Sequence, residues 1–176
     1  GVFITSGDLD GDGFAEVIAG GGPGGGPRIF ALSGQGLIGG TQTQLANFFA
    51  GDTASRGGIR PAAKDLDGDG FAEVIAGGGP GGGPRVFALS GQDLLSGTQT
   101  QRANFFAGDT ESRGGVRLAV KDLDGDTRAD LVTGAGTGAG SRVTAYAGSA
   151  IPVDGTPPTL LGFDAFPEFT GGVFVG

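Results

Sequence analysis

Residues 64–77 read KDLDGDGFAEVIAG, and this stretch decides the fold because it occurs three times. Residues 7–20 read GDLDGDGFAEVIAG and residues 121–134 read KDLDGDTRADLVTG, so that the copies are 57 residues apart. Residues 8–59 and 65–116 differ at only seven aligned positions. Such regular self-similarity is typical of repeat proteins, in which every unit forms the same structure and packs on its neighbours.

The spacing divides the chain into three equal units, residues 1–57, 58–114 and 115–171. The third unit departs from the pattern after Ala147. The register returns at Gly172, because Gly172-Val173-Phe174 falls at the repeat position of Gly1-Val2-Phe3. Residues 172–176 are therefore expected to begin a fourth repeat or to act as a closing strand.

Each unit is expected to contain four short β-strands. In the first unit these are Val2–Ser6, Ala15–Gly20, Arg28–Leu32 and Leu45–Ala50, which are rich in β-branched or aromatic residues and are bounded by turn formers. The segment GGGPGGGP at 20–27 predicts a loop, and SGQGLIGGTQTQ at 33–44 predicts a second, longer loop or wide hairpin. With 41 glycines and 9 prolines in 176 residues, we expect few helices.

The predicted fold class is all-β, with three antiparallel four-stranded units stacked face to face like the blades of a β-propeller. Closed propellers use about four to eight blades. Three blades are too few to close a ring, so we expect the chain to be part of a larger propeller or one that is completed by oligomerisation.

Composition limits the chemistry available to the chain. Cysteine, histidine, methionine and tryptophan are absent, which leaves oxygen atoms as the metal ligands. The net charge of −8 and the pI near 4.3 argue against binding to nucleic acid or to an anionic membrane. No apolar run approaches the ~20 residues of a membrane helix, so membrane insertion is not expected.

The recurring loop places carboxylates at every second position. At ~4 Å and an effective dielectric constant of about 20, each carboxylate pair costs on the order of 4 kcal/mol, which a bound cation would offset. Counted from the first aspartate, positions one, three, five and nine are acidic, and position seven offers its backbone carbonyl. The candidate ligands are Asp8, Asp10, Asp12, Phe14 and Glu16; Asp65, Asp67, Asp69, Phe71 and Glu73; and Asp122, Asp124, Asp126, Arg128 and Asp130.

Calcium is the expected ion, about one per repeat and three in all. A flexible cage of carboxylates suits Ca²⁺, whereas Mg²⁺ retains more of its waters. An EF-hand is excluded because position twelve is Ala19, Ala76 or Thr133 instead of glutamate. The alternative is a solvated acidic turn, since Asp and Gly are common turn formers. The threefold recurrence, each time with an acid at position nine, favours the metal site.

The stretch DLDGDGFAEVIAGGGP resembles the FG-GAP repeat of integrin α-subunit propellers and their bacterial relatives. The motif of that family is D-x-D-x-D-G-x-x-D, followed by a strand and a turn similar to Gly-Ala-Pro. The resemblance covers all three units and implies a seven-bladed propeller in the best-known members, with Ca²⁺ in the loop between the first two strands of a blade. Two departures are Glu16 and Glu73 at position nine and Thr127 in place of glycine.

Repeated arginines allow two interpretations. Arg28, Arg85 and Arg142 share one repeat position, and Arg56 and Arg113 share another. They could bind an anionic glycan, but pairing with acids of a neighbouring blade is the favoured interpretation. Gly20–Gly25 matches G-x-G-x-x-G by composition, yet the segment lacks the Lys-Ser/Thr of a phosphate loop and no helical pattern follows. We therefore expect an inter-strand loop there.

The predicted function is non-enzymatic: an extracellular or cell-surface propeller, stabilised by calcium, with a structural, adhesive or self-assembly role. Loops of modest affinity, roughly 10⁻⁴–10⁻³ M, suit extracellular calcium. The expected partners are other copies of the chain or adjacent blades, with an extracellular protein or glycan as a further class. The alternatives are a carbohydrate- or protein-binding module and, less favoured, a lyase-like enzyme acting on acidic polysaccharides.

Overall fold

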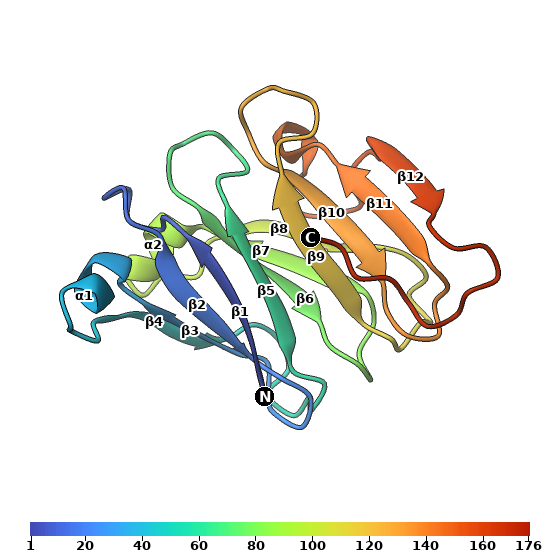
Figure 1. Cartoon of the computed structure of the whole chain (residues 1–176), viewed down its shortest axis with the longest axis horizontal. Helices are drawn as coiled ribbons and strands as arrows, with labels where there is room; N and C mark the ends of the chain where they lie inside the picture. Colours follow the sequence, from blue (N-terminus) through green and yellow to red (C-terminus); the bar gives the residue numbers. More distant parts are fainter.

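The computed structural model describes residues 1–176 and contains three separate four-stranded antiparallel sheets (Figure 1). The first sheet holds β1 (Val2–Gly7), β2 (Glu16–Gly21), β3 (Arg28–Leu32) and β4 (Gln44–Phe49). The second holds β5 (Ile59–Lys64), β6 (Glu73–Gly78), β7 (Arg85–Leu89) and β8 (Gln101–Phe106). The third holds β9 (Val116–Lys121), β10 (Asp130–Ala135), β11 (Arg142–Tyr146) and β12 (Leu161–Asp164). The predicted all-β blades are confirmed.

Strands pair in chain order within every sheet, so each unit is a meander. The first strands β1, β5 and β9 lie side by side, and the outer strands β4, β8 and β12 lie away from this line (Figure 1). The three sheets do not close a ring, which is the arrangement of a partial propeller. None of the helices is long and apolar enough to cross a membrane.

The strands of the first unit lie close to their predicted positions. Arg28–Leu32 is confirmed exactly, and the other three strands differ from the prediction by one residue at one or both ends. The turn at Gly24 has a φ of +91°, a value that glycine adopts without steric cost, so the predicted glycine-rich loop is also confirmed.

The segment at 33–44 connects the antiparallel strands β3 and β4, so the predicted wide hairpin is confirmed, but it also contains a helical turn that the sequence did not predict. Short helices α1 (Gly34–Ile38) and α2 (Gly91–Leu95) form there, and a 3₁₀ helix η1 (Gly148–Ala150) occupies the equivalent place in the third unit. The Ser33 hydroxyl accepts a hydrogen bond from the Gly36 N–H at 3.1 Å and so caps α1. The sequence did not predict this helical turn because the segment contains several glycines, which have a low helix propensity.

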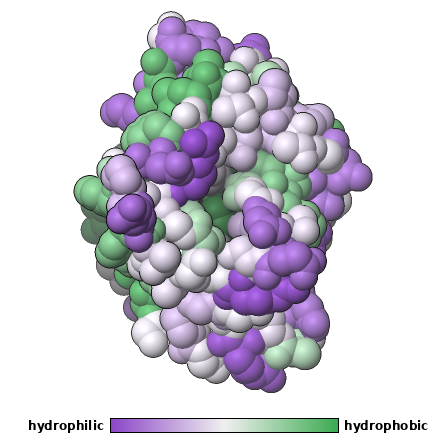
Figure 2. Space-filling model, turned by 90° about the vertical axis from the view of Figure 1, so that its right-hand side faces the viewer, coloured by the Kyte–Doolittle hydropathy of each residue, from purple (hydrophilic) through white to green (hydrophobic).

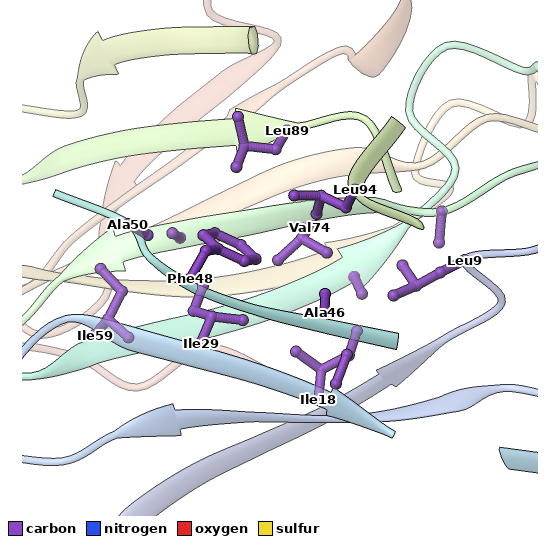
Figure 3. Packing of buried hydrophobic residues seen from close by; sticks show 14 residues of the cluster. Leu9, Ile18, Ile29, Ala46, Phe48, Ala50, Ile59, Val74, Leu89 and Leu94 are labelled. Carbon is purple, nitrogen blue, oxygen red and sulfur yellow. The ribbon is translucent and has the colours of Figure 1, made fainter. Parts of the chain in front are cut away.

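The hydrophobic core is divided between the sheets. One cluster fills the space between the first two sheets and includes Leu9, Ile18, Phe48, Ile59 and Val74 (Figure 3). A second cluster lies between the second and third sheets. Each sheet thus buries apolar residues against its neighbour, and burial of such side chains contributes roughly 1.5–3 kcal/mol each.

The repeated arginines bond within their own units, which contradicts the expectation that they pair with a neighbouring blade. The Nε atoms of Arg28 and Arg85 donate to the side chains of Asn47 and Asn104 at 2.8 and 2.9 Å. The remaining three also bond locally: Arg142 pairs with Asp164, and Arg56 and Arg113 donate to backbone carbonyls of their own loops.

Two other arginines bond beyond their own sheets, Arg60 to the next sheet and Arg117 to the C-terminal segment. Arg60 Nη1 donates to the carbonyl of Gly78 in its own sheet and to that of Val116 in the next, at 3.3 and 3.2 Å. Arg117 repeats the arrangement with the carbonyls of Ala135 and Val173, at 2.6 and 3.4 Å. The Arg60 bonds tie β5 to β9, and the Arg117 bonds tie the third sheet to the C-terminal segment.

Candidate metal centres

The acidic loops join the first and second strands of each sheet, as the family resemblance implies. Their ends are fixed by strand pairing, because Gly7 pairs with Glu16 and Lys64 pairs with Glu73. Lys121 and Asp130 form the same pair in the third sheet. Eight residues thus lie between the paired ends of each loop, and they fold back so that the first acid of the loop meets the acid that begins the second strand.

Three carboxylates converge in every loop, those of positions one, three and nine. In each loop one oxygen from each of the three lies within 4.8 Å of the others. The groups are Asp8, Asp10 and Glu16; Asp65, Asp67 and Glu73; and Asp122, Asp124 and Asp130. Nine of the candidate ligand residues therefore form three clusters that could hold a metal ion, one per repeat.

The fifth-position aspartates have a different role in this geometry. Asp12 Oδ1 accepts the N–H of Phe14 at 2.8 Å, and the same bond forms in the other two loops. Their carboxylates lie outside the groups of three. The predicted ligand role of Asp12, Asp69 and Asp126, and of the carbonyls of Phe14, Phe71 and Arg128, stays a prediction.

The loop backbone orients the first aspartate. Asp8 accepts the N–H groups of Gly11 and Gly13 on its two oxygens, at 2.7 and 3.0 Å. Asp65 and Asp122 accept equivalent bonds. Because each carboxylate oxygen has more than one acceptor position, these bonds fix the side chain and leave capacity for a cation.

The ninth-position acids are buried beneath the loops. One oxygen of each acid accepts the backbone N–H of the second residue of its loop. Glu16 accepts from Leu9 at 2.6 Å, Glu73 from Leu66 at 2.8 Å and Asp130 from Leu123 at 2.7 Å. The second oxygen of Asp130 accepts the Gly148 N–H at 3.1 Å. Glu73 is 1% exposed, and its Oε1 is buried without a hydrogen-bond partner.

Burial also changes the proton affinity of these acids. Burial, assisted by the charges of Asp67, Asp69 and Asp65, raises the pKa of Glu73 to about 7, although the Leu66 N–H opposes the shift. Burial likewise raises the pKa of Glu16 and of Asp10. A buried carboxylate without a counterion is costly, so the unpartnered Glu73 oxygen beside two aspartates fits a divalent cation.

Thr127 distinguishes the third loop. Gly13 and Gly70 have φ values of +86° and +91°, and Thr127 adopts +74° at the same position. A β-branched residue in this left-handed region is strained, because its Cβ crowds the backbone. The third loop therefore keeps the shape of the other two at a steric cost.

Arg102 distinguishes the second loop. Its guanidinium lies 3.7 Å from Asp67 and 3.9 Å from Asp69, whereas the first unit has Leu45 at this position. The arginine supplies part of the positive charge that the acidic loop needs. Of these two carboxylates only that of Asp67 belongs to the converging group, and there the arginine would compete with a bound cation.

The loops are joined to the following blade. The Ala72 N–H donates to the carbonyl of Asp8 at 2.7 Å, and the Ala129 N–H donates to that of Asp65 at 2.9 Å. The Phe71 ring also lies against Gly11, where a Cβ would be 2.9 Å from the ring. The first residue of each of these loops thus contacts the neighbouring sheet.

The sequence did not identify Gly34 and Gly148 as parts of the site. Their N–H groups approach Glu16 Oε1 at 3.4 Å and Asp130 Oδ1 at 3.1 Å. A side chain on Gly34 would collide with the carbonyl of Ala15. The Ser-Gly pair that recurs at 33–34 and 90–91 could have drawn attention to these positions. Their place beneath the acidic loops, however, is set by the fold and could not be inferred from the sequence.

Comparison with protein families decides the relationship. Residues 8–76 and 65–133 match the FG-GAP-like repeat, and each match includes two acidic loops. The chain belongs to the FG-GAP-like repeat family. A comparison with curated proteins finds no match.

Two solved structures resemble this FG-GAP-like repeat chain, both with 19% sequence identity over 94% of it. They are the rhamnogalacturonan lyase YesW, with a TM-score of 0.58, and the Bacillus licheniformis rhamnogalacturonan lyase PL11, with a TM-score of 0.59. The chain spans 34% of each of these structures. At this identity the likeness shows the fold.

Proposed function

We propose that this chain is a calcium-stabilised, non-enzymatic β-propeller segment with a structural or adhesive role at an extracellular site or cell surface. The observation that carries the proposal is Glu73, whose buried Oε1 has no hydrogen-bond partner and lies in a cluster with Asp65 and Asp67. A cation there would satisfy this oxygen and remove the repulsion among the three carboxylates.

Calcium fits the ligand chemistry best. The clusters offer only oxygen atoms, which are the ligands of hard cations. In each cluster the carboxylates come from one short loop and a strand end, and Ca²⁺ tolerates irregular coordination by such ligands, whereas Mg²⁺ requires a near-ideal octahedron. Extracellular calcium is plentiful enough to fill sites of modest affinity, which supports the proposed location.

A structural role follows from where the ions would bind. Each cluster holds the turn between two strands, and the carbonyls of Asp8 and Asp65, which begin two of the loops, accept hydrogen bonds from the next blade. Bound calcium would therefore stabilise both the blade and its contact with the neighbour. The carboxylates of the three clusters are engaged in these turns, which is the use that a structural role gives them.

Thermal unfolding with and without calcium tests the proposal. A ligand at 100 times its dissociation constant stabilises a protein by about 2.7 kcal/mol per site, so removal by a chelator should lower the melting temperature by many degrees. Glu73→Gln should abolish one site and reduce the calcium-dependent shift. Glu111→Gln, in an exposed loop, is the matched control and should leave the shift unchanged. Identical melting curves in calcium and chelator would refute the proposal.

Glycan or protein binding is a second candidate function. A cavity of about 370 Å³ between the first and second sheets is lined by Phe49, Phe106, Asp52 and Arg85, a mixture of aromatic and charged side chains. Aromatic surfaces beside polar groups suit saccharides and peptides. A glycan array with the calcium-loaded chain tests this function, and a single ligand class lost in Phe49→Ala would establish it.

A further inference from the structure

The outer strands β4 and β8 carry the same pair of polar residues, but only one pair is covered. Gln44 and Asn47 stand in β4 where Gln101 and Asn104 stand in β8. Gln44 and Asn47 are exposed, whereas Gln101 and Asn104 are half-buried. The molecule thus contains the same polar site twice, once open and once occupied by another part of the chain.

The occupied site binds a bend of the third unit. Gln101 Nε2 donates to the carbonyl of Val153 at 2.8 Å, and Asn104 Nδ2 donates to Asp154 Oδ1 at 3.3 Å. The Gly155 N–H donates to the backbone carbonyl of Asn104 at 3.2 Å. Gly155 has a φ of +93°, a conformation that residues with a side chain rarely adopt. The outer edge of β8 therefore recognises an aspartate followed by glycine.

The second unit does not place its corresponding segment on β4. There the N–H of Thr98 returns to the carbonyl of Asp93 at 3.0 Å, so that the chain turns back after α2. In the third unit Pro152 stands at the repeat position of Leu95. Proline disfavours a helical conformation in the residue before it, so only the short helix η1 forms and the chain continues to β8.

A groove of about 210 Å³ consequently lies between β4 and α2. Gln44 and Asn47 line it together with the apolar Leu45, Leu94 and Leu95. Figure 1 shows α2 beside β4, and the groove is separate from the hollow at the opposite end of the molecule, which the third sheet forms (Figure 2). The segment that corresponds to the covering bend is present here but turned away, so the groove is open with both of its blades in place.

The polar groups of the open site are already oriented. Arg28 Nε donates to Asn47 Oδ1 at 2.8 Å, as Arg85 Nε donates to Asn104 Oδ1 at 2.9 Å. Asn47 Nδ2 contacts only Gln44 Oε1, at 3.5 Å, which is long for a hydrogen bond. Arg28 forms no ion pair. A carboxylate bound to Asn47 would therefore also lie near an uncompensated positive charge, which is complementary to it.

We propose that the groove between β4 and α2 binds a loop of another protein that contains a bend of sequence Asp-Gly. The Gln44 side chain donates to the carbonyl before the aspartate, the Asn47 side chain donates to the aspartate, and the Asn47 carbonyl accepts the glycine N–H. Leu45 and Leu95 offer apolar surface to the residues that flank the bend. The inference rests on the adhesive role proposed above, to which it adds a surface and a partner of defined chemistry.

A separate protein suits the groove better than a second copy of this chain. Residues 153–155 already form three hydrogen bonds with β8, and a second copy would lose these bonds in order to form the same three on β4. A loop that is exposed in its own protein exchanges only bonds to water. Its carboxylate also accepts a charge-assisted hydrogen bond, which is stronger than one between neutral groups.

A synthetic peptide of residues 151–157, IPVDGTP, tests the inference because it contains the bend that β8 accepts. Its addition to the isotope-labelled full-length chain should shift the NMR signals of the side-chain amides of Gln44 and Asn47. The signals of Gln101 and Asn104 should stay in place, because their site is already occupied. The same peptide with Asp154→Ala should bind roughly tenfold more weakly, since it lacks the carboxylate that Asn47 binds.

Two matched variants of the protein complete the test. Asn47→Asp keeps the oxygen that Arg28 holds but removes the Nδ2 donor, so it should weaken peptide binding roughly tenfold or more. Asn104→Asp makes the same change at the occupied site and should leave the affinity for the peptide unchanged. Equal loss of affinity in both variants would overturn the inference.

Three further outcomes would also decide the inference. It would be overturned by unshifted Gln44 and Asn47 signals at millimolar peptide, or by equal affinity for the two peptides. Concentration-dependent shifts of these signals without peptide would assign the groove to a second copy and overturn the proposed partner. Peptide binding without calcium-dependent melting would support the groove and contradict calcium stabilisation, whereas calcium-dependent melting without peptide binding would contradict only the groove.

Discussion

At the scale of single residues, the three acidic loops differ most at the position where the backbone needs a left-handed conformation. Thr127 stands where the other loops have glycine. Thr127→Gly is expected to stabilise the protein by about 1 kcal/mol and to raise the calcium affinity of the third loop, because the strain is released. Thermal unfolding and calcium titration measure both effects. Gly13→Thr is the converse variant and should destabilise the protein. If both variants were as stable as the native chain, strain at Thr127 would be contradicted.

Glu73 predicts a dependence of stability on pH. Its pKa in the metal-free fold is about 7, above the ordinary value of 4.5, so the folded state retains a proton that the unfolded state has lost between these values. The metal-free protein should therefore become less stable as pH rises from about 4.5 through 7. With calcium the trend should be reversed, because the ion binds the carboxylate form. Melting curves between pH 5 and 8 measure the slope, which Glu73→Gln should reduce in both cases.

At the scale of elements, β8 and the second acidic loop are coupled through Arg102. Arg102→Leu copies the residue of the first unit and should raise the calcium affinity of the second loop by about two- to fivefold, since an exposed ion pair contributes roughly 0.2–1 kcal/mol. Leu45→Arg should lower the affinity of the first loop by a similar factor. Calcium titration of both variants provides the comparison. A lower affinity in Arg102→Leu would show that the arginine supports the site.

The sequence predicted the strands more completely than the acidic site. The repeat spacing and the β-branched residues located all four strands of the first unit within one residue, because local composition determines where strands and glycine turns form. The helix at Gly34–Ile38 was missed, since two of its five residues and the two residues that follow it are glycines, and its stability comes from the cap and from packing. The burial of Glu16 and Glu73 could not be predicted, because it depends on the segment that folds beneath the loop.

The arginines illustrate the same limit. Arg28 and Arg85 recur with the period of the repeat, and this was interpreted as a link between blades. Their actual partners are Asn47 and Asn104, which lie diagonally across on the adjacent strand, two residues from the positions directly opposite the arginines. Repetition alone does not tell whether a partner lies in the same sheet or in the next. Strand register decides that question.

At the scale of the whole molecule, Arg60 connects the second and third sheets, and Arg117 connects the third sheet to the C-terminal segment. Arg60→Ala removes two hydrogen bonds from a charged donor, one of them across the interface, and should lower the free energy of unfolding by about 1–3 kcal/mol. Arg113→Ala removes bonds only within one exposed loop and should cost less than about 0.5 kcal/mol. Denaturant unfolding measures the free energy of unfolding of both variants. Equal decreases in the two would contradict a special role for Arg60 between the sheets.

The near identity of the first two units has a consequence for how the chain folds. β4 and β8 differ only at Leu45 and Arg102, and both pair with their neighbours in the same register. Either strand can therefore complete either sheet with the same cross-strand partners. Side-chain contacts therefore do not determine which strand joins which sheet. The length of the connection does, because closing a short loop loses less entropy than closing a long one. The order of the blades is set by chain connectivity, and concentrated refolding should produce strand-swapped species.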